Sequence, residues 1–98
     1  MSKEIIIKKL SQELSSLKSQ YPIKELGIFG SVARGDDTKK SDVDILVEFN
    51  KNHNMGLFEF VGLEQDLSAL LGKKVDLVMK SGLKPAIKKY ILKEVIYV

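Results

Sequence analysis

The sequence predicts a small α/β or α+β domain whose mixed β-sheet is flanked by helices. Three observations support this fold class: helical spacing of apolar residues in segments 3–20 and 57–71, β-branched apolar runs at 43–49 and 75–79, and the absence of repeats and linkers. A chain of 98 residues is long enough for one modest hydrophobic core. We therefore expect a single domain over residues 1–98.

Residues 3–20 are expected to form an amphipathic helix. Ser2 is a suitable N-cap, and the polar residues of the segment follow a helical rather than an alternating period. The apolar face of this helix is formed by Ile6, Leu10, Leu14 and Leu17. The helix should end at Tyr21-Pro22, because proline disfavours the helical conformation of the residue before it. Residues 25–30 then form a short buried strand that ends at Gly30-Ser31.

The clearest strand pattern covers residues 43–49, between polar loops at 36–41 and 50–54. A helical apolar stripe follows, which Gly72 closes in the C′ position, and a third strand is predicted at 75–79. The stripe consists of Leu57, Phe60, Val61, Leu67, Leu70 and Leu71. Because the segment between the two strands is about long enough for a crossover, we expect these strands to be parallel or mixed neighbours.

The C-terminal segment contains a turn at Ser81-Gly82 and a helix whose first turn holds Pro85. Its buried face is expected to contain Leu83, Ile87, Tyr90 and Ile91. Residues 95–98 form a short extended piece. Seven lysines lie in residues 73–98 against only Asp76 and Glu94, so this quarter of the chain is basic. The helical lysines gather on an exposed face, which suits solvent or an acidic partner surface.

The composition excludes several classes of protein. A hydrophobic fraction of 44% and a charged fraction of 30% are ordinary for a soluble globular chain. No apolar run approaches the roughly 20 residues that span a bilayer, so we expect no membrane contact. The chain has no cysteine and no secretory leader pattern, which favours the reducing cytoplasm. Aromatic residues are not interleaved with the basic ones, so direct nucleic-acid binding is not expected.

Three aspartates are candidates for metal binding. Side chains alternate along a strand, so Asp42 and Asp44 point to one face, roughly 6.6 Å apart at about 3.3 Å of rise per residue. Asp76 lies in the third strand with apolar neighbours on both sides, where a charge is costly without a partner. If the two strands are adjacent, the three carboxylates can hold two magnesium ions for phosphoryl or nucleotidyl transfer.

A phosphate site is indicated directly before these carboxylates in the sequence. Gly30 and Gly35 allow close approach of the backbone to a phosphate group. Ser31 opens a short helix-like turn whose free N–H groups and hydroxyl can bind anionic oxygens. Arg34 can add a charge-assisted hydrogen bond to the same phosphates.

The glycine-serine motif and the aspartates together indicate a nucleotide site far more specifically than either feature does alone. The segments Gly30-Ser31-Val32-Ala33-Arg34-Gly35 and Ser41-Asp42-Val43-Asp44 resemble the signature of the DNA polymerase β-like nucleotidyltransferase superfamily, and of its minimal nucleotidyltransferase branch in particular. The resemblance covers nearly the whole chain and includes the strand with a single aspartate at 75–78. It implies a polymerase β-like fold and an active nucleotidyltransferase.

The resemblance also implies roles for individual residues. Gly30 and Ser31 hold the triphosphate of ATP, with Arg34 and Ser41 as further nucleotide-binding residues. The catalytic and metal-binding residues are Asp42, Asp44 and Asp76. The first two bind both magnesium ions, while Asp76 completes the metal site and helps to activate the acceptor hydroxyl.

Members of this branch resemble the antitoxin half of toxin–antitoxin pairs whose toxin is a helical HEPN ribonuclease. The expected activity is therefore transfer of AMP from ATP to a tyrosine hydroxyl of the toxin, within a hetero-oligomer. Two alternatives stay open. The chain can neutralise its toxin by binding alone, or it can be a nucleotidyltransferase acting on RNA or a small molecule.

Overall fold

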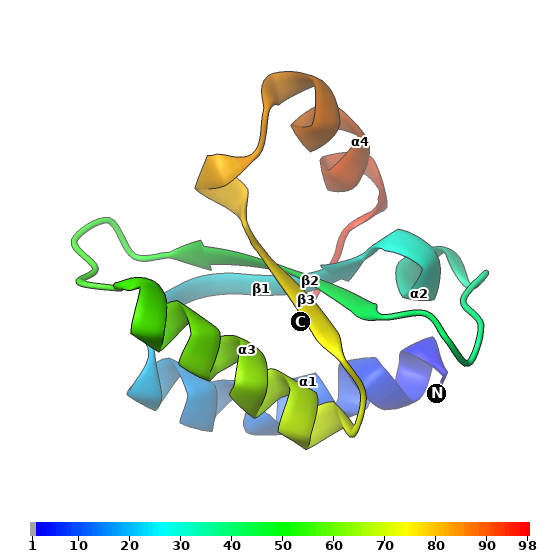
Figure 1. Cartoon of the computed structure of the whole chain (residues 1–98), viewed down its shortest axis with the longest axis horizontal. Coiled ribbons are helices and arrows are strands. Elements are labelled where there is room, and N and C mark those ends of the chain that lie inside the picture. The colour runs from blue at the N-terminus through cyan, green and yellow to red at the C-terminus, as the bar shows by residue number, and fades with distance from the viewer. Residues whose placement is uncertain (1) are drawn as a thin grey trace.

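The computed structural model describes residues 2–98 and contains a mixed four-stranded sheet (Figure 1). The strands are β1 (Ile23–Phe29), β2 (Val43–Phe49), β3 (Val75–Met79) and β4 (Ile96–Tyr97). Their order in the sheet is β3-β2-β1-β4. β1 pairs with β2 and β4 in antiparallel fashion, whereas β2 and β3 are parallel. The crossover expected between β2 and β3 is thus present, and the fold class predicted from the sequence is confirmed.

Helices lie on both faces of this sheet. They are α1 (Lys3–Gln20), α2 (Gly30–Arg34), α3 (Leu57–Leu71) and α4 (Pro85–Glu94), with a 3₁₀ turn at Lys80–Gly82. α1 and α3 run along one face, and α4 lies on the opposite face (Figure 1). The short helix α2 follows β1 directly and lies against β2 and α4.

Local sequence signals set the ends of most of these elements. The Ser2 hydroxyl accepts a hydrogen bond from the Ile5 N–H at 3.3 Å, which caps α1 as predicted. Gly72 ends α3 in the left-handed conformation, at φ +65°. The predicted ranges of α1, β2, α3 and β3 match the observed ones, while β1 begins two residues before the predicted position 25.

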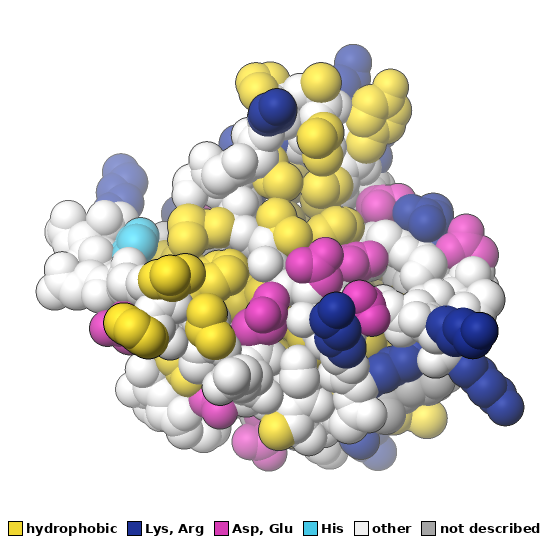
Figure 2. Space-filling view, viewed as in Figure 1, with side chains coloured by type: hydrophobic (Ala, Val, Ile, Leu, Met, Phe, Trp, Pro, Cys, Tyr) yellow, Lys and Arg dark blue, Asp and Glu magenta, His cyan; other side chains and the backbone are white. Residues whose placement is uncertain are grey.

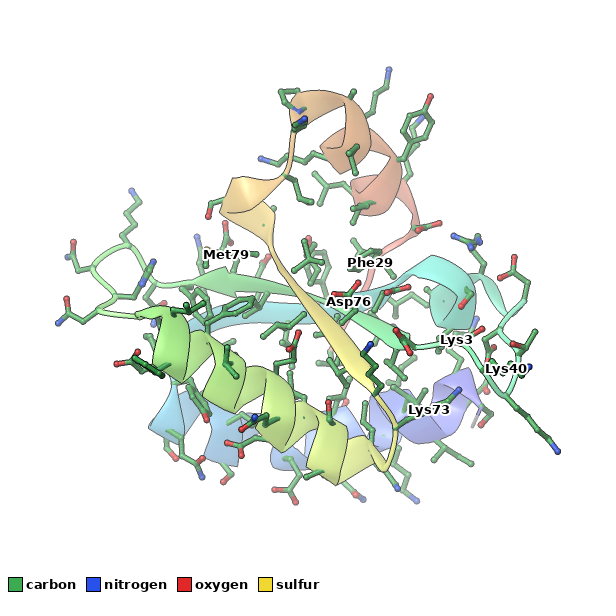
Figure 3. The ribbon with its side chains drawn as sticks, viewed as in Figure 1. Lys3, Phe29, Lys40, Lys73, Asp76 and Met79 are labelled. Carbon is green, nitrogen blue, oxygen red and sulfur yellow. The ribbon has the colours of Figure 1, made fainter. Side chains whose placement is uncertain are left out.

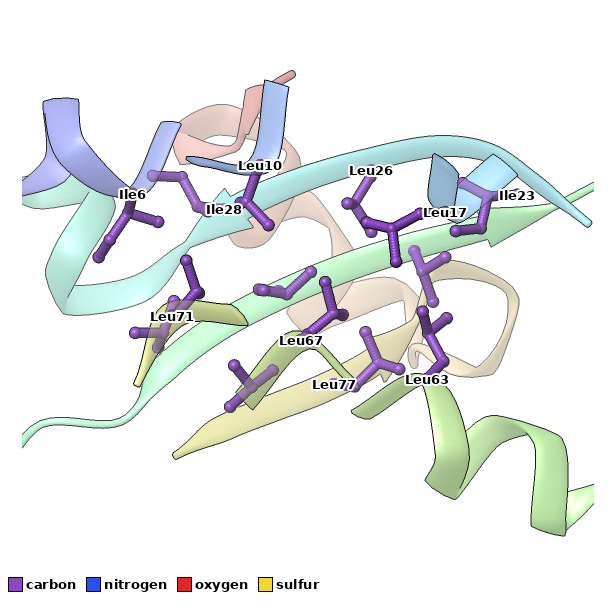
Figure 4. Close-up of a cluster of buried hydrophobic side chains, with 14 of the residues drawn as sticks. Ile6, Leu10, Leu17, Ile23, Leu26, Ile28, Leu63, Leu67, Leu71 and Leu77 are labelled. Atoms are coloured by element: carbon purple, nitrogen blue, oxygen red, sulfur yellow. The ribbon is translucent and has the colours of Figure 1, made fainter. Parts of the chain in front are cut away.

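The main hydrophobic core lies between the sheet and the pair α1 and α3 (Figure 4). Alternate residues of β2 point into it, and three of them are fully buried: Val43, Ile45 and Val47. They meet a stripe from the two helices that includes Ile6, Leu10, Leu63, Leu67 and Leu71. The intervening residues of β2 therefore face the other side of the sheet, where α4 lies.

The α4 side of the sheet holds a much smaller apolar cluster, built on Phe29, Leu46 and Ile91. Ile91 is the buried residue of α4. The prediction that Ile87 and Tyr90 also lie on a buried face is wrong, because they are 51% and 72% exposed. The sequence shows a stripe at helical spacing, but in α4 only the Ile91 end of this stripe packs against the sheet, and within residues 2–98 no further layer lies over α4 (Figure 1).

Among residues 2–98, no helix combines the length and the apolar character needed to cross a membrane.

Candidate active site

The three aspartates lie around the start of the parallel strand pair. Asp44 stands directly opposite Asp76 in the register of β2 and β3. Asp42 immediately precedes β2, and its carboxylate Oδ2 lies 3.9 Å from the ammonium of Lys74. Side-chain alternation places Asp44 on the α4 side of the sheet, as it does Leu46. The sequence predicted that Asp44 and Asp76 would meet only if their two strands were adjacent, and in the structure these strands are adjacent.

Asp44 and Asp76 differ in their environment. Asp44 is half-buried, whereas Asp76 is exposed on the edge strand β3 (Figure 3). The sequence argument that apolar neighbours bury the charge of Asp76 is wrong, because Val75 and Leu77 point into the core on the other side of the strand. Asp76 is consequently open to a molecule that approaches from solvent.

The carboxylates repel one another. Burial raises the pKa of Asp44, and the neighbouring charges of Asp76 and Asp42 raise it further, while the Arg34 guanidinium opposes this rise. Figure 2 shows acidic side chains gathered on the face below α4. Such a group of oxygen ligands suits a hard divalent cation such as Mg²⁺, which would offset the repulsion. Within residues 2–98, however, no three acidic, histidine or cysteine side chains are already close enough to hold an ion, so the three aspartates would have to converge around it.

Gly30 brings the end of β1 against this acidic group. Its φ is +74°, in the left-handed region that side chains other than glycine rarely adopt. A β-carbon at this position would overlap the Oδ2 atom of Asp44 and would lie 3.0 Å from its Cγ. Glycine is therefore required here by both conformation and space.

The helix α2 begins at Gly30 and ends at Arg34, and Gly35 is its C-cap. The N–H of Gly35 donates to the carbonyl oxygens of Ser31 at 2.9 Å and Val32 at 3.1 Å, with Gly35 at φ +83°. This compact turn holds Ser31 beside Gly30 and directs Arg34 toward the C-terminal end of α4. The sequence pattern of two glycines around a short turn thus corresponds to one compact unit next to Asp44.

The Gly30 N–H and the Arg34 guanidinium both donate hydrogen bonds to Glu94, a residue that the sequence pattern did not indicate. The Gly30 N–H donates to Oε1 of Glu94 at 3.0 Å. Arg34 Nη1 donates to Oε2 of Glu94 at 3.1 Å, and Arg34 Nε donates to Oδ2 of Asp36 at 3.2 Å. Glu94 lies 64 positions after Gly30 and directly follows Lys93 in the sequence, so no local pattern could have indicated this contact.

Ser41 shapes the loop before Asp42. Its hydroxyl oxygen accepts a hydrogen bond from the Thr38 N–H at 2.9 Å, and its own N–H donates to the Thr38 carbonyl at 3.1 Å. The observed contacts of Ser41 are therefore within its loop, where they fix the approach of the chain to Asp42.

All three aspartates are at least partly exposed to solvent. Two hollows lie elsewhere: one of about 430 Å³ between α1 and α3, lined by Leu17 and Leu70, and one of about 210 Å³ beside His53 and Met79. In the second hollow His53 has a structural role, since its Nδ1 accepts from the Met55 N–H at 3.2 Å. Neither hollow is lined by Asp42, Asp44 or Asp76, of which Asp76 is the most exposed to solvent.

Comparisons with known proteins point to one family. A model of the nucleotidyltransferase domain matches residues 7–98. The protein adenylyltransferase MntA of Thermococcus cleftensis is 47% identical over 89 residues, which are 91% of this chain and 88% of the relative. A solved structure of a candidate minimal nucleotidyltransferase matches with a TM-score of 0.81 at 33% identity, over 98% of this chain and 95% of the other.

A more distant solved structure has the same fold. It is a complex of a tri-AMPylated Shewanella oneidensis HEPN toxin with MNT antitoxin, with a TM-score of 0.68 at 18% identity, over 94% of this chain and 70% of the matched one. At this identity the likeness shows a shared fold, whereas the closer matches show common family membership.

Proposed function

Since the chain belongs to the minimal, polymerase β-like branch of the nucleotidyltransferase domain family, we propose that it transfers AMP from ATP to a tyrosine hydroxyl of a HEPN ribonuclease toxin. Family membership makes the chain a nucleotidyltransferase, as the sequence motif predicted. Transfer to a protein is supported by the MntA relative, a protein adenylyltransferase, and the HEPN partner is supported by the likeness to an antitoxin bound to an AMPylated toxin, whereas the tyrosine acceptor rests on the resemblance of the sequence motif. In the cytoplasm the chain would act as the antitoxin of that partner.

The observation that carries the proposal is the placement of Gly30 against Asp44, with Asp76 opposite Asp44 in the neighbouring strand. This arrangement puts the backbone that would bind phosphate next to Asp44 and Asp76, with Asp42 two residues before Asp44 in the chain. Asp42, Asp44 and Asp76 would hold two magnesium ions. When bound, these ions would neutralise the charge that develops on the phosphate oxygens.

The chain's own residues position the nucleotide. The Gly30 and Ser31 N–H groups and the Arg34 guanidinium would bind the β- and γ-phosphates, with Ser41 in the neighbouring loop completing the nucleotide site. The acceptor oxygen then bonds to the α-phosphorus, while the bond from that phosphorus to the bridging oxygen breaks and pyrophosphate leaves. The exposed carboxylate of Asp76 would accept the hydroxyl proton.

The experiment that tests this function is the intact mass of the co-expressed helical partner after incubation with ATP and Mg²⁺. We expect a gain of one or more AMP units with the wild-type chain and none with the Asp42→Asn, Asp44→Asn double variant. The matched control is Glu25→Gln, Glu48→Gln, which removes two carboxylates that face each other across β1 and β2. The control should retain transfer, because its charges pair with Lys24 and Lys80 instead.

A second candidate function is neutralisation of the toxin by binding alone. It is favoured by the exposed apolar side chains of α4, Ile87 and Tyr90, which suit a protein surface. Under this alternative the Asp42→Asn, Asp44→Asn variant still protects cells from the toxin and the partner's mass never changes. Loss of protection in a folded double variant would instead support the enzymatic function.

A further inference from the structure

The backbone N–H and the guanidinium that the proposed function assigns to the triphosphate are both bound by one carboxylate of the same chain. Glu94 Oε1 lies 3.0 Å from the Gly30 nitrogen, and Glu94 Oε2 lies 3.1 Å from Arg34 Nη1. The Glu94 side chain is 27% exposed, so most of its surface is covered in this position. A carboxylate thus sits where phosphate oxygens would have to bind.

We propose that Glu94 is an internal competitor for the phosphates of the nucleotide and has to leave Gly30 and Arg34 before a triphosphate binds there. The inference rests on the proposed function, and it assigns to Glu94 the role of lowering the affinity of the site for the phosphates of the nucleotide. A carboxylate and a phosphate accept the same charge-assisted hydrogen bonds from N–H donors and from arginine. The single Gly30 N–H cannot serve both at full strength, and two anions side by side repel each other.

The position of Glu94 in the fold allows it to move. It is the last residue of α4, a helix that buries Ile91 alone. The Val95 that follows is in an extended conformation, with φ −63° and ψ 137°. A rotation of the Glu94 side chain would therefore free both donors while Ile91 stays in its cluster with Phe29 and Leu46.

Arg34 has a second carboxylate partner, which supplies a matched control. Asp36 binds Arg34 Nε at 3.2 Å but makes no contact with the Gly30 nitrogen, whose acceptor is Glu94. Both carboxylates are near the same arginine, so neutralising either one removes one negative charge. Glu94→Ala also removes the acceptor of the Gly30 N–H, and Glu94→Gln replaces it with a neutral amide oxygen that binds this donor less strongly, which separates specific competition from a general charge effect.

The test is calorimetric titration of the chain with tripolyphosphate and with the non-hydrolysable ATP analogue AMP-PNP, each in Mg²⁺. We expect Glu94→Gln, which keeps the size of the side chain, to bind both probes about tenfold more tightly than wild type. Glu94→Ala should bind at least as tightly as Glu94→Gln. Asp36→Asn should change the affinity by less than about threefold. In an Arg34→Gln background the gain from Glu94→Gln should shrink, since the two residues share one interaction.

Equal or weaker binding of AMP-PNP by both folded Glu94 variants would overturn the inference while leaving the proposed function in place. An equal gain from Asp36→Asn would also overturn it, because the effect would then be general electrostatics. If neither the wild-type chain nor the variants bind AMP-PNP or tripolyphosphate, the proposed function fails and the inference fails with it. Thermal unfolding of each variant establishes that the compared proteins are folded.

Discussion

The backbone of Gly30 lies so close to the carboxylate of Asp44 that no β-carbon fits between them. Gly30→Ala should therefore destabilise the fold by about 2 kcal/mol or more, through the left-handed φ and the overlap together. Because the substitution would also displace Asp44, nucleotide transfer should be lost. Urea unfolding at neutral pH measures the first effect.

Gly35→Ala is the matched control for this prediction. Gly35 has a similar left-handed φ of +83°, but apart from its neighbours in the chain no atom lies within 4 Å of the place that a β-carbon would take. Gly35→Ala should therefore lower the stability only by the conformational cost of a left-handed φ, about 1 kcal/mol. If the two variants lose the same stability, the contact between Gly30 and Asp44 is not as tight as described.

Asp44→Asn should stabilise the free protein while it abolishes transfer. Burial and the charges of Asp76 and Asp42 raise the pKa of Asp44, which means that its ionised form is disfavoured in the folded chain. Removing the charge relieves this repulsion, so the thermal midpoint at pH 7 without divalent cations should rise. Glu48→Gln should not raise it, since Glu48 lies near Lys24 and Lys80. A lower midpoint for Asp44→Asn would contradict the repulsion.

Magnesium should stabilise the wild-type chain through the same carboxylates. A cation that binds the folded state alone raises stability by about RT ln(1 + [Mg²⁺]/Kd), so the thermal midpoint should climb with its concentration. In the Asp42→Asn, Asp44→Asn variant this climb should disappear, whereas Glu25→Gln, Glu48→Gln should retain it. An identical response of both variants would place the cation elsewhere on the surface.

The hydrogen bond from Tyr21 to Asp66 should be lost when Tyr21 ionises, so the stability of the fold should fall at high pH. The Tyr21 hydroxyl donates to Asp66 Oδ2 at 2.6 Å, and burial together with this bond raises the pKa of Tyr21 from 10.0 to about 12. The folded chain then holds the proton more tightly than the unfolded chain does. The contribution of protonated Tyr21 to the free energy of unfolding is therefore complete below pH 10 and is lost as the pH rises from 10 to 12.

Unfolding in urea across this pH range tests that sign. Tyr21→Phe should cost about 1 kcal/mol at pH 8, and the difference from wild type should diminish above pH 10. Tyr97→Phe, a change at a 44% exposed ring, is the control and should leave the stability and its pH dependence unchanged. A difference between Tyr21→Phe and wild type that stays constant to pH 12 would refute the linkage.

Two side chains of α3 accept hydrogen bonds from backbone N–H groups on the outer edge of β3. The Val75 N–H donates to the Ser68 hydroxyl at 3.1 Å, and the Leu77 N–H donates to Glu64 Oε2 at 3.0 Å. Ser68→Ala should cost about 1–2 kcal/mol, because it leaves a partly buried backbone donor without its acceptor. Ser15→Ala, on the exposed face of α1, should change stability by less than about 0.5 kcal/mol in the same urea assay. Equal effects of the two variants would argue against the edge contact.

Much of the fold could be predicted from local patterns. The helices at 3–20 and 57–71 and the strands at 43–49 and 75–79 match the observed bounds, because their apolar periodicity and the capping residues Ser2 and Gly72 act over a few positions. The exposure of Ile87 and Tyr90 was not predictable in this way. A stripe shows which face of a helix is apolar, whereas only the packing shows whether another element covers it.

The same division holds for the candidate site. The sequence by itself determined the residue types: a glycine that can adopt a left-handed φ next to a serine, and aspartates on strands that alternate with core residues. Only the tertiary structure decided that β2 and β3 are parallel with Asp44 opposite Asp76, and that Glu94 occupies the donors of Gly30 and Arg34. Strand pairing and contacts across 64 positions depend on how the whole chain packs, and no short segment of sequence encodes them.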